Sequence, residues 1–350
     1  MSKIINKKKY WLLLILCLLL GIALWQRNWT VYLYTQAKGG LNVAFNTRPL
    51  TEVLHDPKVP DSLKARIRLI SEIKRYAIDS LGLKDNPDVY QTLFDQHGKP
   101  LVYLVTAAEP YKMEAVEFHF PIIGNFTYKG FFDSTMAAQE LKIWQQKGYD
   151  TDLGQGIAYS TLGWLPEPIL SSMLFYSEGK LASLIIHEMT HGTIFVKNEH
   201  ETSENLANFI GEYGAKRYLK AKYGIESEEY QKFARGKEWR KVLVTHLNKS
   251  TLALDSLYKT FKPEYTKTYK DSLKYTFIRK IVAKEDSLYA QLSHKPLLSS
   301  KLKNEDLPNN AYFVGFKTYH SKQNEFEQIF EKQFRGDFRK FLQYLEKRFE

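Results

Sequence analysis

The sequence predicts an α+β fold that is predominantly helical, with a small β-sheet and one N-terminal transmembrane helix. Long stretches place apolar residues at three- and four-residue steps, and the clearest of them runs from Asp61 to Leu81. This is the period of an α-helix with one buried face. Two short segments, 101–105 and 115–120, are rich in β-branched and aromatic residues and lie between prolines. That composition is typical of strands.

The first 29 residues predict a membrane anchor. Residues 1–9 form a basic tail with four lysines, and residues 11–25 follow without a charge. The positive-inside rule places such a tail in the cytoplasm and the remainder of the chain beyond the membrane. The run is short for a span, so a cleaved signal peptide over residues 10–29 is the alternative. We therefore expect a single-pass inner-membrane protein whose main part faces the periplasm.

Residues 30–350 are expected to form a single domain with a helical C-terminal part, because no repeat or low-complexity linker divides them. Phenylalanines recur at four-residue steps from Phe326 to Phe338, which indicates packing. Besides the segments above, we expect helices over 30–46, 134–148 and 227–293, and a further short strand over 154–160.

The composition excludes several kinds of site. Cys17 is the only cysteine and lies in the N-terminal apolar run, so the domain has no disulfide, no cysteine nucleophile and no cysteine-based zinc site. The net charge of +11 comes from lysines spread over the second half of the chain. No basic cluster is set among stacking aromatic residues, so nucleic acid is not an expected partner.

The segment His187-Glu188-Met-Thr-His191 specifies chemistry by itself. On a helix, His187 and His191 project from one face about one turn apart, which is the spacing for two nitrogens to bind one Zn²⁺ ion. Glu188 then points toward the open side of the ion, where a carboxylate can take a proton from water. The neighbouring residues are apolar, as expected of a buried helix. A pair of core histidines is the alternative for the pentapeptide alone.

A third ligand is expected thirteen residues after His191. We expect Thr202 or Ser203 to cap a helix that begins at Glu204 and has small residues on the same face, so it can approach the histidine helix closely. Glu204 is therefore a candidate ligand. Glu212, two helical turns further on, could accept a hydrogen bond from a metal-binding imidazole without binding the metal itself. The connecting segment offers three rival ligands, Glu199, His200 and Glu201.

The chain after the apolar run resembles the bacterial family of predicted aminopeptidases, zinc-dependent proteins of the zincin superfamily. The residues that carry the resemblance are Tyr34-Thr-Gln-Ala37, Arg48-Pro49, Phe120 to Asp133, Ala158 to Trp164, Leu181 to His191, Glu204-x-x-Ala207, and Asn309-Asn-Ala311 with Tyr319. The resemblance implies a zincin-like catalytic core over 30–350 with Glu204 as the third metal ligand. Family members usually have Asn before that acid, whereas this chain has Ser203.

Motif and resemblance together lead to a functional hypothesis. We expect a zinc peptidase in which His187, His191 and Glu204 hold one Zn²⁺ and Glu188 acts as the general base toward a zinc-bound water, with a peptide or protein as substrate. Tyr159 and Tyr319 are candidates to stabilise the oxyanion. Two alternatives stay open: a metallo-endopeptidase acting on envelope proteins or cell-wall peptides, and a non-catalytic membrane-anchored protein with a structural zinc site.

Overall fold

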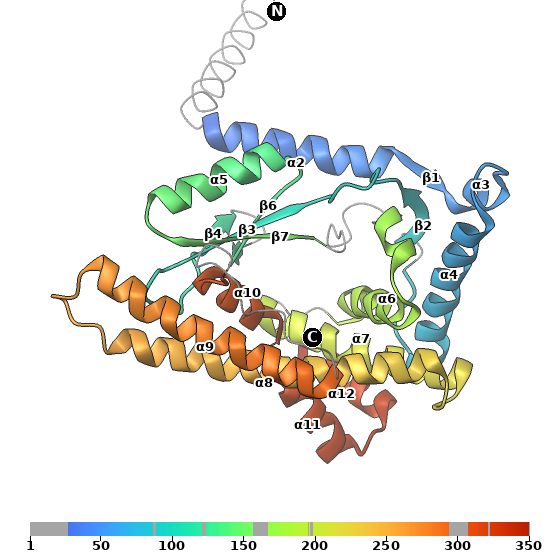
Figure 1. Ribbon diagram of the computed structural model, residues 1–350. Helices are drawn as coiled ribbons and strands as arrows, with labels where there is room; N and C mark the ends of the chain where they lie inside the picture. Colours follow the sequence, from blue (N-terminus) through green and yellow to red (C-terminus); the bar gives the residue numbers. More distant parts are fainter. Residues whose placement is uncertain are drawn as a thin grey trace, which may run out of the picture.

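The computed structural model describes residues 27–86, 89–120, 124–156, 167–194, 196, 199–293, 307–320 and 323–349. Figure 1 shows α2 along one side of the molecule and the long pair α8 and α9 along the opposite side, with the strands between them. The helices are α2 (Arg27–Phe45), α3 (Leu50–His55), α4 (Asp61–Leu81), α5 (Ser134–Gln146), α6 (Glu178–Thr193), α7 (His200–Tyr223), α8 (Glu228–Lys259), α9 (Lys267–Ser293), α10 (Asn310–His320), α11 (Gln323–Phe334) and α12 (Phe338–Phe349).

The strands form three small sheets in place of the single sheet that the sequence predicts. One has the order β1-β2-β8, with β2 and β8 parallel; the second has the order β6-β3-β7 and is antiparallel; the third is the hairpin β4-β5. Their bounds are β1 (Thr47–Pro49), β2 (Val89–Phe94), β3 (Tyr103–Ala108), β4 (Phe118–Phe120), β5 (Gly124–Phe126), β6 (Lys129–Phe131), β7 (Asp150–Gln155) and β8 (Glu167–Leu170).

Helix α4 confirms the strongest periodic pattern in the sequence. It spans Asp61–Leu81, and its apolar stripe is buried. The helix ends at Gly82, whose φ of 76° is left-handed and whose N–H bonds the carbonyls of Ala77 and Ile78. Glycine adopts this conformation without the steric cost that a Cβ would add.

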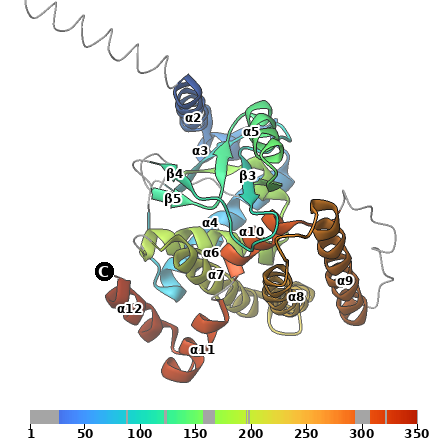
Figure 2. The same cartoon turned by 90° about the vertical axis from the view of Figure 1, so that its left-hand side faces the viewer.

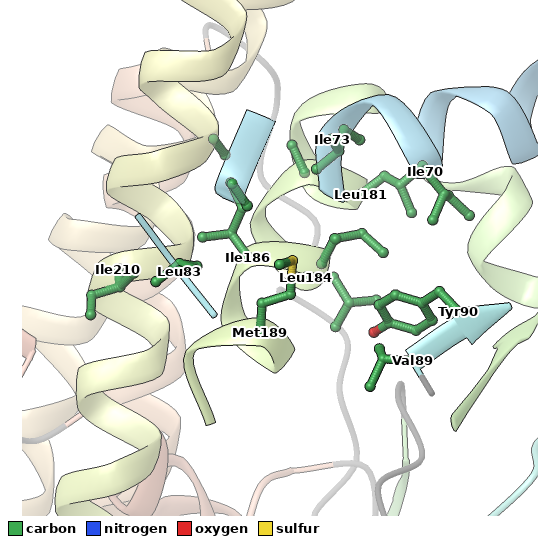
Figure 3. Packing of buried hydrophobic residues seen from close by; sticks show 14 of the residues in the cluster. Ile70, Ile73, Leu83, Val89, Tyr90, Leu181, Leu184, Ile186, Met189 and Ile210 are labelled. Atoms are coloured by element: carbon green, nitrogen blue, oxygen red, sulfur yellow. The ribbon is translucent and has the colours of Figure 1, made fainter. Parts of the chain in front are cut away.

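The largest apolar core lies between α4, α6, α7 and the β1-β2-β8 sheet, and α11 and α12 close it. Figure 3 shows Ile70 and Ile73 of α4 beside Leu181 of α6. Each of these side chains is almost completely buried, which contributes about 1.5–3 kcal/mol apiece. This core fixes α6 in place. A separate cluster joins α8, α9 and α10, which Figure 2 shows on the side away from α2.

The predicted membrane helix at residues 10–29 requires correction. No helix in the described ranges combines the length and the apolar character that a membrane span needs. Helix α6 is apolar but has 16 residues, and the longer α7, α8 and α9 carry charges throughout. Residues 27–29 belong to α2, and residues 10–26 lie outside the described residues. Within the described residues, nothing supports the predicted transmembrane helix or the inner-membrane, periplasmic location that rested on it.

Two helix boundaries also differ from the sequence-based expectation. Helix α7 begins at His200 and not at Glu204. Thr202 thus lies inside the helix, and its hydroxyl donates to the Glu199 carboxylate at 2.7 Å. The C-terminal phenylalanine repeat spans two helices. Arg335 and Gly336 both have a positive φ, which turns the chain between α11 and α12.

Candidate metal centre

Helices α6 and α7 pack closely because small residues line the contact on α7. A Cβ added to Gly211 would lie 2.6 Å from the carbonyl oxygen of Ser183 and 3.1 Å from the Cβ of His187. A Cβ added to Gly214 would lie 2.9 Å from Ile186. The small face of α7 predicted from the sequence is thus confirmed, and it brings the side chains of the two helices within bonding reach of one ion.

His187, His191 and Glu204 converge on one point. The Nε2 atoms of the two histidines are 3.2 Å apart. One Glu204 oxygen lies 3.5 Å from Nε2 of His187, and the other lies 3.4 Å from Nε2 of His191. These side chains are 15%, 24% and 14% exposed, respectively, so the point is sheltered but reachable. In the part of the chain that the structure describes, no other group of histidine, cysteine and acidic residues meets in this way.

The spacing fits a tetrahedral zinc ion. Bonds of about 2.1 Å at tetrahedral angles separate neighbouring ligand atoms by about 3.4 Å. The two nitrogens are 3.2 Å apart, and each lies 3.4 or 3.5 Å from a different oxygen of Glu204, so all of these separations are close to this value. Two imidazoles and one carboxylate are also a donor set that zinc accepts. The residues present therefore fit a zinc ion.

Two side chains of α7 contact the imidazoles. The Oγ of Ser203 lies 3.3 Å from Nδ1 of His191, and the side chain of Asn208 hydrogen bonds to His187. With Nδ1 of His191 protonated toward Ser203, the Nε2 lone pair faces Glu204, as metal binding requires. Sequence reasoning missed the Asn208 contact and assigned such a role to Glu212. Glu212 instead lies 3.5 Å from Arg240 and 3.9 Å from Lys237 of α8.

The electrostatics of the three groups show how strongly they depend on one another. Burial disfavours the charged form of Glu204, but hydrogen bonds from His187 and His191 outweigh it and hold the pKa of this carboxyl far below its usual range. Burial likewise opposes protonation of His187, yet its bond to Glu204 and the charge of Glu188 raise its pKa. The Glu204 carboxylate thus stays ionised although it is mostly buried. A buried carboxylate in its charged form is suited to binding a cation.

Glu188 lies next to His187 on α6 and is partly buried. Burial raises the pKa of its carboxyl, while the nearby imidazoles of His187 and His191 act in the opposite direction. The charges of Glu204 and Glu167 add to the upward shift. Glu188 is therefore a carboxylate beside the candidate metal centre that can take up a proton more readily than an exposed glutamate.

Of the rival ligands, Glu199 precedes α7 without a capping hydrogen bond from its side chain and accepts a hydrogen bond from Thr202, and Glu201 lies in the first turn of α7. Neither is part of the converging group, and the side chain of His200 lies outside the described residues.

The two candidate oxyanion donors cannot be placed. Tyr159 lies outside the described residues, while Tyr319 belongs to α10 with an undescribed side chain. Their assignment stays a prediction.

The comparison with protein families identifies the chain at this point. A family model described as "Putative aminopeptidase" matches residues 31–349. The chain belongs to this family. No curated protein and no solved structure in the comparisons matches it. The match to the aminopeptidase family model thus includes nearly all of the described residues, among them the candidate metal centre.

One motif of the aminopeptidase resemblance, Asn309-Asn310, is structural. Asn310 is fully buried, accepts a hydrogen bond from the Tyr258 hydroxyl at 2.8 Å and donates to the carbonyl of Glu109, also at 2.8 Å. Its backbone N–H donates to Asp150 at 2.8 Å. Asn310 thereby ties α10 to α8, to β7 and to the segment after β3.

Proposed function

We propose that this chain is a zinc-dependent aminopeptidase, with His187, His191 and Glu204 as the metal ligands and Glu188 as the general base. The observation that carries the proposal is the set of separations of 3.2–3.5 Å between the two Nε2 atoms and from each of them to one oxygen of Glu204, with Glu188 adjacent on α6. The family supplies the peptidase class.

The donor set favours a hydrolytic over a purely structural role. Structural zinc sites commonly use four protein ligands, whereas catalytic sites use three and leave one position open. Within the described residues, three ligand atoms converge here and no fourth histidine or acidic residue joins them. Bound zinc would polarise a scissile carbonyl and make water a better nucleophile near neutral pH.

Three side chains of this protein have distinct roles in the proposed reaction. The carboxylate of Glu188 takes a proton from the attacking water and passes it to the leaving amine, as a general base that becomes a general acid. The side chains of Ser203 and Asn208 keep the imidazoles turned toward the metal position. The partly buried setting of Glu188 raises the pKa of its carboxyl, in the direction that this proton transfer requires.

A digest of a peptide library by the wild-type protein and by Glu188→Gln tests the proposal. We expect the wild type to hydrolyse peptide bonds, and Glu188→Gln to keep its zinc and to be slower by about 10²–10⁴-fold, the typical contribution of general base catalysis. The cleavage sites show whether residues are removed one at a time from the amino terminus. Equal hydrolysis by both proteins would reject Glu188 as the base.

A further inference from the structure

We propose that helix α2 (Arg27–Phe45) lies on the surface of a membrane that contains anionic lipids, with its outward apolar face among the headgroups. Such a contact is a surface contact and not a membrane span. It goes beyond the proposed peptidase activity and does not depend on it. Figures 1 and 2 show α2 at the outer edge of the molecule, away from α8 and α9.

One face of α2 fixes the helix to the body of the protein. The hydroxyl of the buried Tyr32 and the side-chain amide of Gln36 both donate to the carbonyl of Gly130 in β6, at 3.1 and 2.9 Å. A Cβ added to Gly39 would overlap the ring of Phe132. These contacts fix the rotation of α2 about its own axis, so its opposite face stays turned outward.

The outward face of α2 exposes large apolar side chains to solvent. Leu33, Tyr34 and Phe45 are 58%, 65% and 78% exposed, and Val31 and Leu41 are about half exposed. Their helical spacing places them together on the side away from the core. Soluble proteins rarely keep such an apolar surface in water, and a surface of this kind marks contact with a protein partner or with a membrane.

The charges of α2 indicate which partner covers this face. Arg27 and Lys38 are the charged residues of the helix, which contains no acidic residue. Both are exposed, and helical spacing places them on the outward side with Tyr34 and Phe45. Long cationic side chains beside apolar and aromatic residues are typical of helices that lie in the interface of an anionic membrane, because their charged ends reach the lipid phosphates.

A second copy of the chain fits this face less well. Paired helices use a narrow apolar seam flanked by residues of opposite charge. The apolar side chains of α2 extend instead over the whole outward side, from Leu33 round to Val31. Pairing would also bring the Lys38 side chains of the two copies near each other, with no acidic residue on α2 to offset their repulsion. An anionic lipid surface is the better complement.

A fluorescent label on α2 tests the contact in the full-length chain. Cys17 is the only cysteine, so Cys17→Ser with Leu41→Cys places a single thiol on the outward face for a nitrobenzoxadiazole label. With vesicles of equal parts phosphatidylglycerol and phosphatidylcholine, we expect the emission to shift to shorter wavelength, as for a label that leaves water. The same label at Leu252→Cys, an exposed position on α8, should show no shift.

Charge variants test the preference for anionic lipid at the same labelled site. Arg27→Gln with Lys38→Gln should raise the lipid concentration that gives half of the shift by roughly 30-fold, since each cation near such a surface contributes about 1 kcal/mol. Lys249→Gln with Lys280→Gln is the matched control. It removes the same charge from exposed positions on α8 and α9 and should leave the half-shift concentration unchanged.

Three results would overturn the inference. The first is no shift at residue 41, whether or not another part of the chain holds the protein on the vesicles. The second is an equal shift at residue 41 with vesicles of pure phosphatidylcholine. The third is a shift without vesicles that grows with protein concentration, which would assign the outward face of α2 to a second copy.

Discussion

Gly211 of α7 faces the backbone carbonyl of Ser183 on α6, at a distance that leaves no room for a side chain. A Cβ at residue 211 would lie 2.6 Å from that oxygen, which is closer than van der Waals contact allows. His187 begins the metal-binding motif four residues after Ser183. The absence of a side chain at Gly211 therefore sets the separation between the helix that carries both histidines and the helix that carries Glu204.

Gly211→Ala should consequently weaken both the fold and the metal centre. We expect a loss of about 1–3 kcal/mol in the free energy of unfolding, as for other overpacked contacts. We also expect at least roughly tenfold weaker zinc binding, because the three ligand atoms no longer converge. Urea unfolding and zinc titration measure the two effects.

Gly236→Ala on α8 is the matched control. A Cβ there meets nothing within 4 Å, so the gain in helix propensity should leave stability unchanged or raise it by up to about 1 kcal/mol. Wild-type stability and wild-type zinc affinity in Gly211→Ala would contradict the role given to the helix contact.

Ser203→Ala should lower zinc affinity with little effect on stability. The hydroxyl lies 3.3 Å from Nδ1 of His191, and its loss frees the ring to turn. Removal of such a supporting group typically costs about 10–100-fold in metal affinity. Ser256→Ala, which removes a hydroxyl bonded to the Leu252 carbonyl on α8, should leave zinc affinity unchanged. Identical affinities in both variants would show that His191 needs no such support.

Asn310→Ala should lower the stability of the fold with little effect on zinc binding. The substitution leaves the Tyr258 hydroxyl and the Glu109 carbonyl without their partner in the interior, at a cost of about 3 kcal/mol. The zinc stoichiometry should stay at the wild-type level, since Asn310 contacts none of the three ligands. Asn125→Ala, on the exposed β4-β5 hairpin, should change stability by less than about 0.5 kcal/mol. An equal loss of stability in the two variants, measured by urea unfolding, would show that the buried hydrogen bonds of Asn310 do not stabilise the fold.

Local patterns predicted much of the helical framework. The apolar steps from Asp61 to Leu81 correspond to α4, and the spacing of His187 and His191 places both imidazoles on one face of α6. The small residues after Glu204 predicted the close approach of α7, because the size of a side chain on a helix face limits how near a neighbour can come.

Other features depend on contacts between segments far apart in the sequence. The parallel pairing of β8 with β2 is one of them, since no local pattern encodes it. The left-handed conformation of Tyr90 belongs to the same irregular pairing. The spacing places Asn208 one helical turn after Glu204 on the same face, but it does not predict the hydrogen bond of Asn208 to His187.

The metal content of purified wild-type and Glu204→Ala protein tests the central claim most directly. We predict one zinc ion per wild-type chain. Glu204→Ala should bind much less zinc at equal protein concentration, because two imidazoles alone remain of the three converging ligands. Elemental analysis after dialysis provides both numbers. A wild-type chain without zinc, or a Glu204→Ala chain that keeps a full equivalent, would contradict the account.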